Sequence, residues 1–216
     1  MKMSDFNSTK IRTVVSAIAM IVFGQAAAAQ DSQLYDNAAN PDAGFLRVIA
    51  VRDASAIIAG ENFSDLGEGV SPYVTIEEPG TVSVSAAGVD GTAEIAKGSW
   101  NSWLVTADGK GVLVTDPLGH SPAQADLTFY NISDKPEVDL YVPAAKRVAL
   151  EGVGEGSGDW VALKAPLSLD FEARTGDETL AAVSAVALAR REGTTLVFSG
   201  TNGNYQLVAL KASQVN

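Results

Sequence analysis

The sequence predicts an all-β protein built from two tandem small β-sandwich domains. Three observations support this prediction. Short segments rich in valine, isoleucine and threonine alternate apolar and polar residues with period two, as half-buried strands do. Turn dipeptides such as Pro79-Gly80, Asp90-Gly91 and Asp108-Gly109 separate these segments. Similar opening and closing segments occur in both parts of the chain, which indicates a diverged repeat of immunoglobulin-like domains.

The N-terminal residues 1–29 have the organisation of a signal peptide. A basic start precedes the apolar run Thr13–Gly24, and Ala26–Ala29 supplies the small residues that a signal peptidase recognises. The apolar run is shorter than a membrane-spanning helix, which needs about 20 residues. We therefore expect cleavage near Ala29, export of the remaining chain and no transmembrane anchor after cleavage. A retained membrane anchor is the alternative.

The composition of the remaining chain excludes several kinds of site. The sequence has no cysteine and a single histidine, so it offers no disulfide, no thiolate nucleophile and no cysteine metal site. Without the predicted leader, 12 basic residues face 25 acidic ones, a net charge near −13. Such an acidic surface repels nucleic acid and anionic lipid. We expect no nucleic-acid partner and no cofactor or metal ion.

The first predicted domain, residues 30–116, contains about six or seven short strands between Phe45 and Asp116. The dense apolar stretch Trp100–Val105 is expected to pair with Val112–Val114 across the Asp108-Gly109 turn. Two further strands are expected at Tyr73–Ile76 and Thr81–Ala86.

A linker is predicted at residues 117–124, where two prolines and a glycine interrupt the alternating pattern. The second domain, residues 125–216, is predicted to contain further strands at Leu127–Tyr130, Val138–Val142 and Leu167–Phe171, and a closing hairpin of Leu196–Phe198 and Tyr205–Leu210. The alanine-rich stretch at residues 178–191 fits both a strand and a helix. A strand is favoured because its neighbours are strands.

Residues with catalytic potential are few. His120 is the only imidazole, and it lies in the predicted linker, which is a poor platform for a catalytic base. Ser157 lies in a glycine-rich run that is better explained as a loop between strands. Pairs of carboxylates occur by chance in so acidic a chain and indicate no glycosidase. The chain is therefore predicted not to be an enzyme. A small acetyl-esterase or transferase that uses His120 with Ser121 or Ser157 is a less favoured alternative.

Other residues have both a structural and a binding interpretation. Trp100, Trp103 and Trp160 fit a domain core better than a sugar-binding platform. Asn62 and Asn131 match the acceptor pattern for N-glycosylation, which is frequent by chance. The basic doublets Lys146-Arg147 and Arg190-Arg191 are expected to be solvated, although each could contact an anion.

Several short phrases resemble one known family. The chain contains Leu34-Tyr35-Asp36 followed by Gly44–Val48, and then Leu127–Lys135, which reads Leu-Thr-Phe-Tyr-Asn-Ile-Ser-Asp-Lys. Val186–Leu188 precedes Arg191 and Gly193 near the end. Together these phrases resemble the AlgF family of alginate O-acetylation proteins, over roughly residues 34–211.

The resemblance implies two tandem β-sandwich domains in the periplasm and a non-catalytic accessory role. In such systems a membrane O-acyltransferase exports acetyl groups, and separate periplasmic acetyltransferases place them on the exopolysaccharide. An AlgF-like protein is expected to act as an adaptor between them. A carbohydrate- or surface-binding module is the alternative. From its position before the first domain, the segment containing Leu34, Tyr35, Phe45 and Arg47 is predicted to bind a partner, although it could instead close the first core.

Overall fold

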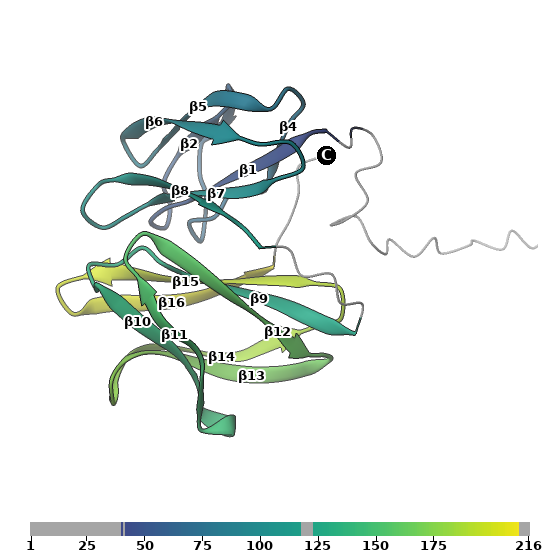
Figure 1. Ribbon diagram of the computed structural model, residues 1–216. Helices are drawn as coiled ribbons and strands as arrows, with labels where there is room; N and C mark the ends of the chain where they lie inside the picture. The colour runs from purple at the N-terminus through teal and green to yellow at the C-terminus, as the bar shows by residue number, and fades with distance from the viewer. Residues whose placement is uncertain (1–39, 41, 118–122, 212–216) are drawn as a thin grey trace, which may run out of the picture. The chain divides into compact units, whose positions relative to one another are not determined.

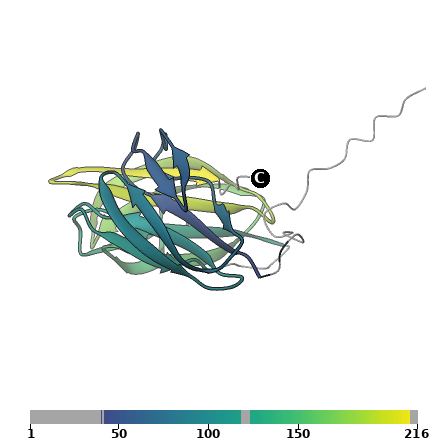
Figure 2. The same ribbon diagram turned by 90° about the horizontal axis from the view of Figure 1, so that it is seen from above.

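The computed structural model describes residues 40, 42–117 and 123–211. The predicted signal peptide, Leu34, Tyr35, His120 and Ser121 lie outside these residues. The described chain is all-β, with strands joined by short connections and one 3-10 turn (Figure 1, Figure 2). No helix in these ranges has the length and hydropathy needed to cross a bilayer. All described residues fall within one compact unit of the chain.

The first half of the described chain forms two four-stranded sheets. One has the order β4-β1-β7-β8 and the other β3-β2-β5-β6. The strands are β1 (Gly44–Ile49), β2 (Ala56–Ile58), β3 (Glu61–Phe63), β4 (Val74–Ile76), β5 (Gly80–Ala86), β6 (Val89–Ile95), β7 (Trp100–Val105) and β8 (Gly111–Thr115).

The second half also forms two four-stranded sheets, with the orders β12-β9-β15-β16 and β11-β10-β13-β14. Its elements are β9 (Gln124–Asn131), β10 (Glu137–Val142), η1 (Pro143–Ala145), β11 (Arg147–Gly154), β12 (Ser157–Lys164), β13 (Leu167–Thr175), β14 (Glu178–Leu188), β15 (Gly193–Thr201) and β16 (Asn204–Lys211).

The strand orders of the two halves are the same when each strand of the first half is matched to the strand eight places later. In each half the opening strand pairs in parallel with the seventh, so β1 lies beside β7 and β9 lies beside β15. The predicted repeat is therefore present in the order of the strands. The division into two tandem sandwich domains stays a prediction.

Each pair of sheets encloses its own hydrophobic core because alternate residues of the strands face inward. Leu46, Val48 and Ile58 belong to the core of the first half. Leu127, Phe129 and other side chains of the second pair form the other core, with Leu140, Phe171 and Phe198 fully buried. A third apolar cluster joins residues from β1 and β7 to residues from β9 and β15. Both faces of these central strands are therefore covered.

Most predicted strands are present, and one turn prediction is wrong. β14 confirms the strand interpretation of residues 178–188. The β5–β6 turn lies at Ala87-Gly88, where both residues have positive φ, and not at Asp90-Gly91. Gly91 instead lies inside β6, where a Cβ would stand 2.5 Å from the Trp103 ring. Gly91 makes room for the Trp103 ring. The Asp90-Gly91 pair therefore has a packing role and does not mark a turn.

Candidate functional site

A buried polar cluster joins the two halves of the chain around Arg47. All six residues of β1 are buried, and Arg47 is only 3% exposed. Its Nε donates to Ser102 Oγ in β7 at 2.8 Å. Its two Nη atoms donate to Thr195 Oγ1 in β15 and to the hydroxyl of Tyr130 in β9, both at 3.0 Å. One guanidinium group therefore connects strands from both halves.

Asp116 supplies the countercharge. Its Oδ2 lies 3.9 Å from Nε of Arg47 and accepts hydrogen bonds from the Tyr73 and Ser102 hydroxyls, each at 2.7 Å. Its Oδ1 accepts a hydrogen bond from the Tyr130 hydroxyl. Asp116 directly follows β8 and borders the predicted linker. The carboxylate therefore meets three hydroxyl donors from three different segments.

The environment fixes the protonation of this cluster. Burial raises the pKa of Tyr130 above its ordinary value, and Arg47 opposes that shift only in part. Burial likewise raises the pKa of Tyr73. Burial alone would lower the pKa of Arg47, but Tyr73, Tyr130 and Asp116 outweigh it and raise that pKa. At neutral pH both phenols are therefore hydrogen-bond donors, and Arg47 keeps its charge.

An apolar cluster adjoins these polar groups. Ile49 and Leu104 come from the first half, and Tyr130, Ile132 and Val197 come from the second. Gly158 in β12 leaves space for the Tyr130 ring, because a Cβ there would lie 2.5 Å from it. Ser102 is 0% exposed, so its side chain is closed to solvent. The arrangement fits a structural joint.

The predicted partner-binding residues lie partly inside this region. Phe45 is 6% exposed and stacks on Trp100, with ring centroids 4.0 Å apart. Tyr73 meets the same tryptophan edge-on at 4.7 Å. The structure thus gives Phe45 and Arg47 contacts within the chain, and partner binding by these two residues stays a prediction. Leu34 and Tyr35 lie outside the described residues.

Of the catalytic candidates, only Ser157 lies within the described residues. Ser157 Oγ donates to the backbone oxygen of Gly154 at 2.7 Å, which closes a turn between β11 and β12. His120 and Ser121 lie outside the described ranges. In the part of the chain that the structure describes, no group of three or more metal-ligating side chains is found.

The phrase Asn131–Lys135 forms a self-bonded loop at the end of β9. The Asn131 side-chain nitrogen donates to the backbone oxygens of Lys135 and Val153, at 2.9 and 3.1 Å. Ser133 Oγ donates to Asn131 Oδ1 at 2.7 Å. Asn131 is fully buried, so this match to the glycosylation pattern has a structural role. Asn62 is exposed, and its modification stays a prediction.

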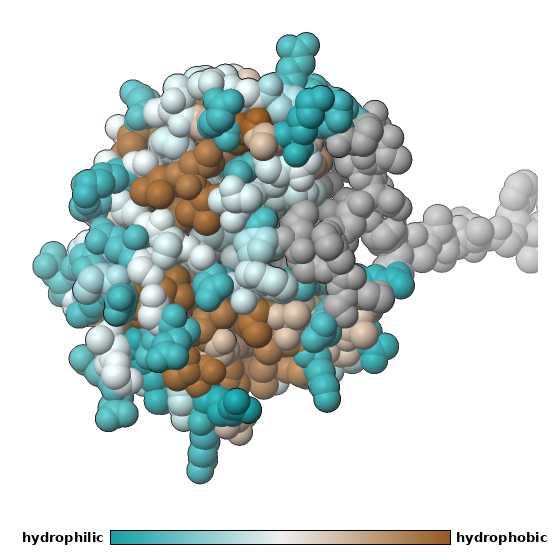
Figure 3. All heavy atoms as spheres, viewed as in Figure 1, coloured by the Kyte–Doolittle hydropathy of each residue, from teal (hydrophilic) through white to brown (hydrophobic). Residues whose placement is uncertain are grey.

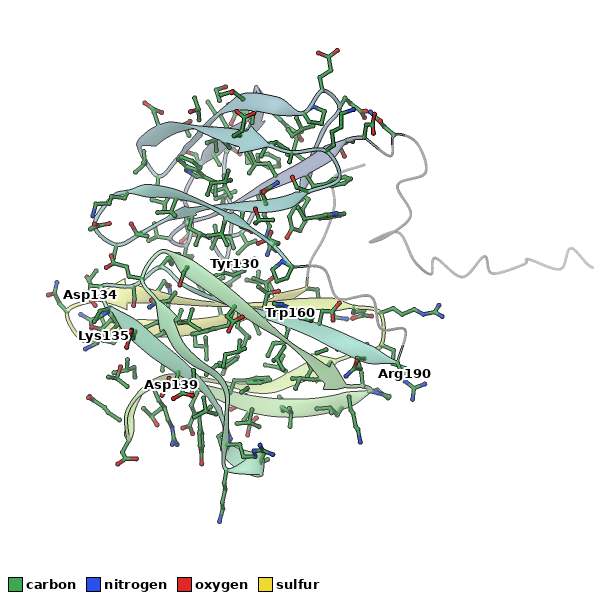
Figure 4. The ribbon with its side chains drawn as sticks, in the orientation of Figure 1. Tyr130, Asp134, Lys135, Asp139, Trp160 and Arg190 are labelled. Atoms are coloured by element: carbon green, nitrogen blue, oxygen red, sulfur yellow. The ribbon has the colours of Figure 1, made fainter. Side chains whose placement is uncertain are left out.

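The same loop holds the closing hairpin. Asp134 accepts hydrogen bonds from the backbone of Asn202 at 2.8 Å and from the Tyr205 hydroxyl at 2.7 Å. These two bonds lower the pKa of Asp134 below its ordinary value. The Lys135 ammonium group lies 5.2 Å from the centroid of the Tyr205 ring. Figure 4 shows Asp134 and Lys135 together at one end of the second half.

The three tryptophans occupy different environments. Trp100 and Trp103 are 7% and 6% exposed, as the core interpretation predicts. Trp160 lies in the edge strand β12 and is 37% exposed. On the face drawn in Figure 3, hydrophobic residues gather in two patches, of which the lower lies over β11 and β12. Exposed apolar patches of this kind mark interaction surfaces.

The sequence reasoning missed most of the buried cluster. No local sequence pattern marks the other members of the cluster, which are Asp116, Tyr73, Tyr130, Ser102 and Thr195. One signal was present, because β1 reads Gly-Phe-Leu-Arg-Val-Ile, with a single arginine in an otherwise apolar strand. A charge in such a strand requires a buried partner.

No protein-family model matches this sequence, and a search of curated proteins likewise gives no match. Among solved structures, the C-terminal domain of AlgF from P. aeruginosa is similar to part of this chain, with 22% sequence identity and a TM-score of 0.37. The similarity covers 41% of this chain and 98% of that domain. A likeness at this level says nothing about what this chain binds.

Proposed function

We propose that this chain is a non-catalytic periplasmic adaptor in the O-acetylation of alginate or a similar exopolysaccharide. Its partners are the periplasmic acetyltransferases and the membrane O-acyltransferase of the same machinery. The chain reaches the periplasm through the signal peptide at residues 1–29. Each half forms one small immunoglobulin-like sandwich.

One observation carries the proposal. Phrases that resemble the AlgF family run along the chain, and the most continuous of them, Leu127–Lys135, covers most of β9 and the loop that follows it. Alternate residues of this phrase fill the core, while Tyr130 contacts Arg47 and Asp134 holds the closing hairpin. The phrase therefore packs the core of the second half and joins that half to the first.

One feature of the described residues supports contacts with proteins. The edge strands β11 and β12 present exposed side chains, including Val148 at 46% and Trp160 at 37%. Aromatic and apolar side chains on an exposed surface are typical anchors of protein interfaces.

Deletion of the gene tests the proposal. We expect the acetyl content of the secreted polymer to fall strongly while the amount of polymer is maintained, and we expect the full-length gene to restore it. Unchanged acetylation in the deletion strain would refute the adaptor role. Hydrolysis of nitrophenyl acetate by the purified chain, abolished by His120→Ala, would instead show the esterase alternative.

The carbohydrate-binding alternative now depends on Trp160, because the other two tryptophans are buried. Binding of an oligosaccharide by the purified chain, lost in Trp160→Ala and retained in the wild type, would favour that alternative. The exposed Val148→Ala variant is the control for a general loss of apolar surface.

A further inference from the structure

Two turns occupy equivalent places in the two halves. In the first half, Ala96–Ser99 connects β6 to β7, and the Ser99 amide donates to Ala96 O at 3.2 Å. In the second half, Ala189–Glu192 connects β14 to β15, and the Glu192 amide donates to Ala189 O at 3.3 Å. The third residue of each turn also donates to the start of its half: Gly98 to Ala43 O and Arg191 to Gln124 O, both at 3.0 Å.

The equivalent position is glycine in one turn and arginine in the other. Gly98 has φ +65° and Arg191 has φ +61°, so both adopt the left-handed conformation. Glycine adopts it without cost, whereas a residue with a Cβ is strained there. The two halves can therefore be compared directly. Glycine adopts this backbone conformation without strain in the first half, whereas arginine adopts it with strain in the second. The backbone of this turn therefore does not require an arginine.

The charges around the two turns also differ. In the first half, Lys97 pairs with Asp42 at 2.8 Å, so its charge is neutralised. The residue equivalent to Lys97 is Arg190, whose Nε donates to the backbone oxygen of Ala165 at 2.8 Å. That bond orients the guanidinium group of Arg190.

Two more cations belong to this end of the second half. Lys164 precedes Ala165 and is exposed, and Arg191 is exposed beside Arg190. Among the described residues neither Lys164 nor Arg191 forms an ion pair. Glu192, which follows Arg191, is occupied by Lys211 at 2.6 Å. Lys164, Arg190 and Arg191 form what we call the basic turn surface.

The described part of the first half has no comparable surface. All four basic side chains of residues 40–117 are paired with carboxylates: Arg47, Arg52, Lys97 and Lys110. Figure 4 shows Arg190 at the end of the second half opposite to Asp134 and Lys135. A small group of unpaired cations therefore lies at one end of an acidic molecule.

We infer that the basic turn surface docks a carboxylate-rich segment of a protein partner. Guanidinium groups bind carboxylates through paired hydrogen bonds, and Arg190 is already oriented by Ala165. A long polyanion would extend beyond three cations onto a surface of the same sign, which repels it. A compact acidic segment avoids that repulsion. The inference rests on the proposed function, because it assigns this surface to one contact of the adaptor.

The test titrates the full mature chain with a short peptide of alternating glutamate and serine at low ionic strength. Arg191→Gly removes one charge and leaves a residue that the equivalent turn already uses. We expect it to weaken peptide binding about tenfold, as the loss of a charge-assisted contact implies, while raising the melting temperature because backbone strain is relieved. A purely structural arginine would not lower binding while raising stability.

The matched control is Lys146→Gly. Lys146 also has a positive φ, +50°, and is also exposed without an ion pair to any residue that the structure describes, but it lies beside η1. We expect the control to bind the peptide like the wild type. Equal weakening in both variants, or no binding by the wild type, would overturn the inference. Tighter binding of a mannuronate oligomer with the same dependence on Arg191 would also overturn it, in favour of a polymer ligand. None of these results alters the deletion test, which measures polymer acetylation.

Discussion

Arg47 illustrates what a charged side chain needs inside a strand that is covered on both faces. Transfer of an unpaired charge to such a site is costly, and hydrogen bonds must replace its hydration. Arg47 bonds three hydroxyl groups and has Asp116 as its countercharge. Three hydroxyl donors in turn surround the carboxylate. The charge is therefore tolerated only while all these groups stay together.

Replacement of Arg47 by methionine is expected to destabilise the chain by about 3 kcal/mol, because Asp116 is then left buried without its countercharge. Urea unfolding of the two purified proteins measures the difference. Arg52→Met is the control, since its pair with Glu68 is about half exposed. The control should cost less than about 1 kcal/mol. An equal loss of stability in both variants would show that the buried pair contributes no more to stability than the exposed pair.

Because the cluster contains buried phenols, we expect the folded protein to lose stability at high pH. Burial raises the folded-state pKa of Tyr130 above its unfolded value of about 10. Its contribution is therefore fully present below about pH 10 and is lost as the pH rises towards the folded-state pKa. Unfolding in urea between about pH 9 and 11 should show this decline. Tyr130→Phe should reduce the slope with pH, and an unchanged slope would contradict the assignment.

The residues of this cluster show where sequence reasoning stops. The burial of Trp100 and Trp103 was predictable, because four of the six side chains in their strand are apolar. The contacts of Arg47 were not predictable, since Ser102, Asp116, Tyr130 and Thr195 come from segments far apart in the sequence. Only the folded arrangement brings these polar groups around one guanidinium.

At the scale of elements, both edge strands of one sheet contain β-bulges. β11 and β14 each have two register shifts, and each shift places one extra residue opposite β10 or β13. At one shift in each strand lie Gly152 and Ala185, which have φ values of +64° and +57°. Their amides donate to Asp139 and Asp170 of the inner strands, at 2.7 and 2.8 Å. Bulges on edge strands hinder unwanted pairing with other chains.

Ala185→Gly should therefore stabilise the chain by roughly 0.5 to 1 kcal/mol, since glycine adopts the left-handed conformation without strain. Ala182→Gly on the same strand is the control. It should destabilise by roughly 0.5 to 1 kcal/mol, because glycine loses more conformational entropy in a regular strand. Thermal melting of both variants decides the matter, and a loss of stability in Ala185→Gly would rule out strain at the bulge.

The strands themselves were largely predictable, and their pairing was not. The period-two pattern located β5, β10 and β13 to within a few residues. The β5–β6 turn was missed because Ala87-Gly88 lacks the usual asparagine or aspartate. The parallel pairs β1–β7 and β9–β15 have no local signal, since parallel pairing joins strands that no short turn connects.

At the scale of the whole molecule, the two halves have the same strand order and share buried clusters that contain residues from both. The repeat alone would favour two independent domains. The buried cluster around Arg47 and the apolar cluster of Ile49, Leu104, Ile132 and Val197 favour coupling instead. Breaking the joint would expose two sets of apolar side chains and separate Arg47 from Tyr130 and Thr195. The halves should therefore unfold together.

Differential scanning calorimetry of the mature chain should accordingly show one transition, with equal calorimetric and van't Hoff enthalpies. Ile132→Ala removes a side chain that belongs to the joint, whereas Ile58→Ala removes one from the core of the first half. Both are nearly fully buried, so each should cost about 2 to 4 kcal/mol. Only Ile132→Ala weakens the coupling, so only its transition should broaden or divide into two. Two transitions in the wild type would show instead that the repeat units unfold independently and that the buried cluster contributes little to holding them together.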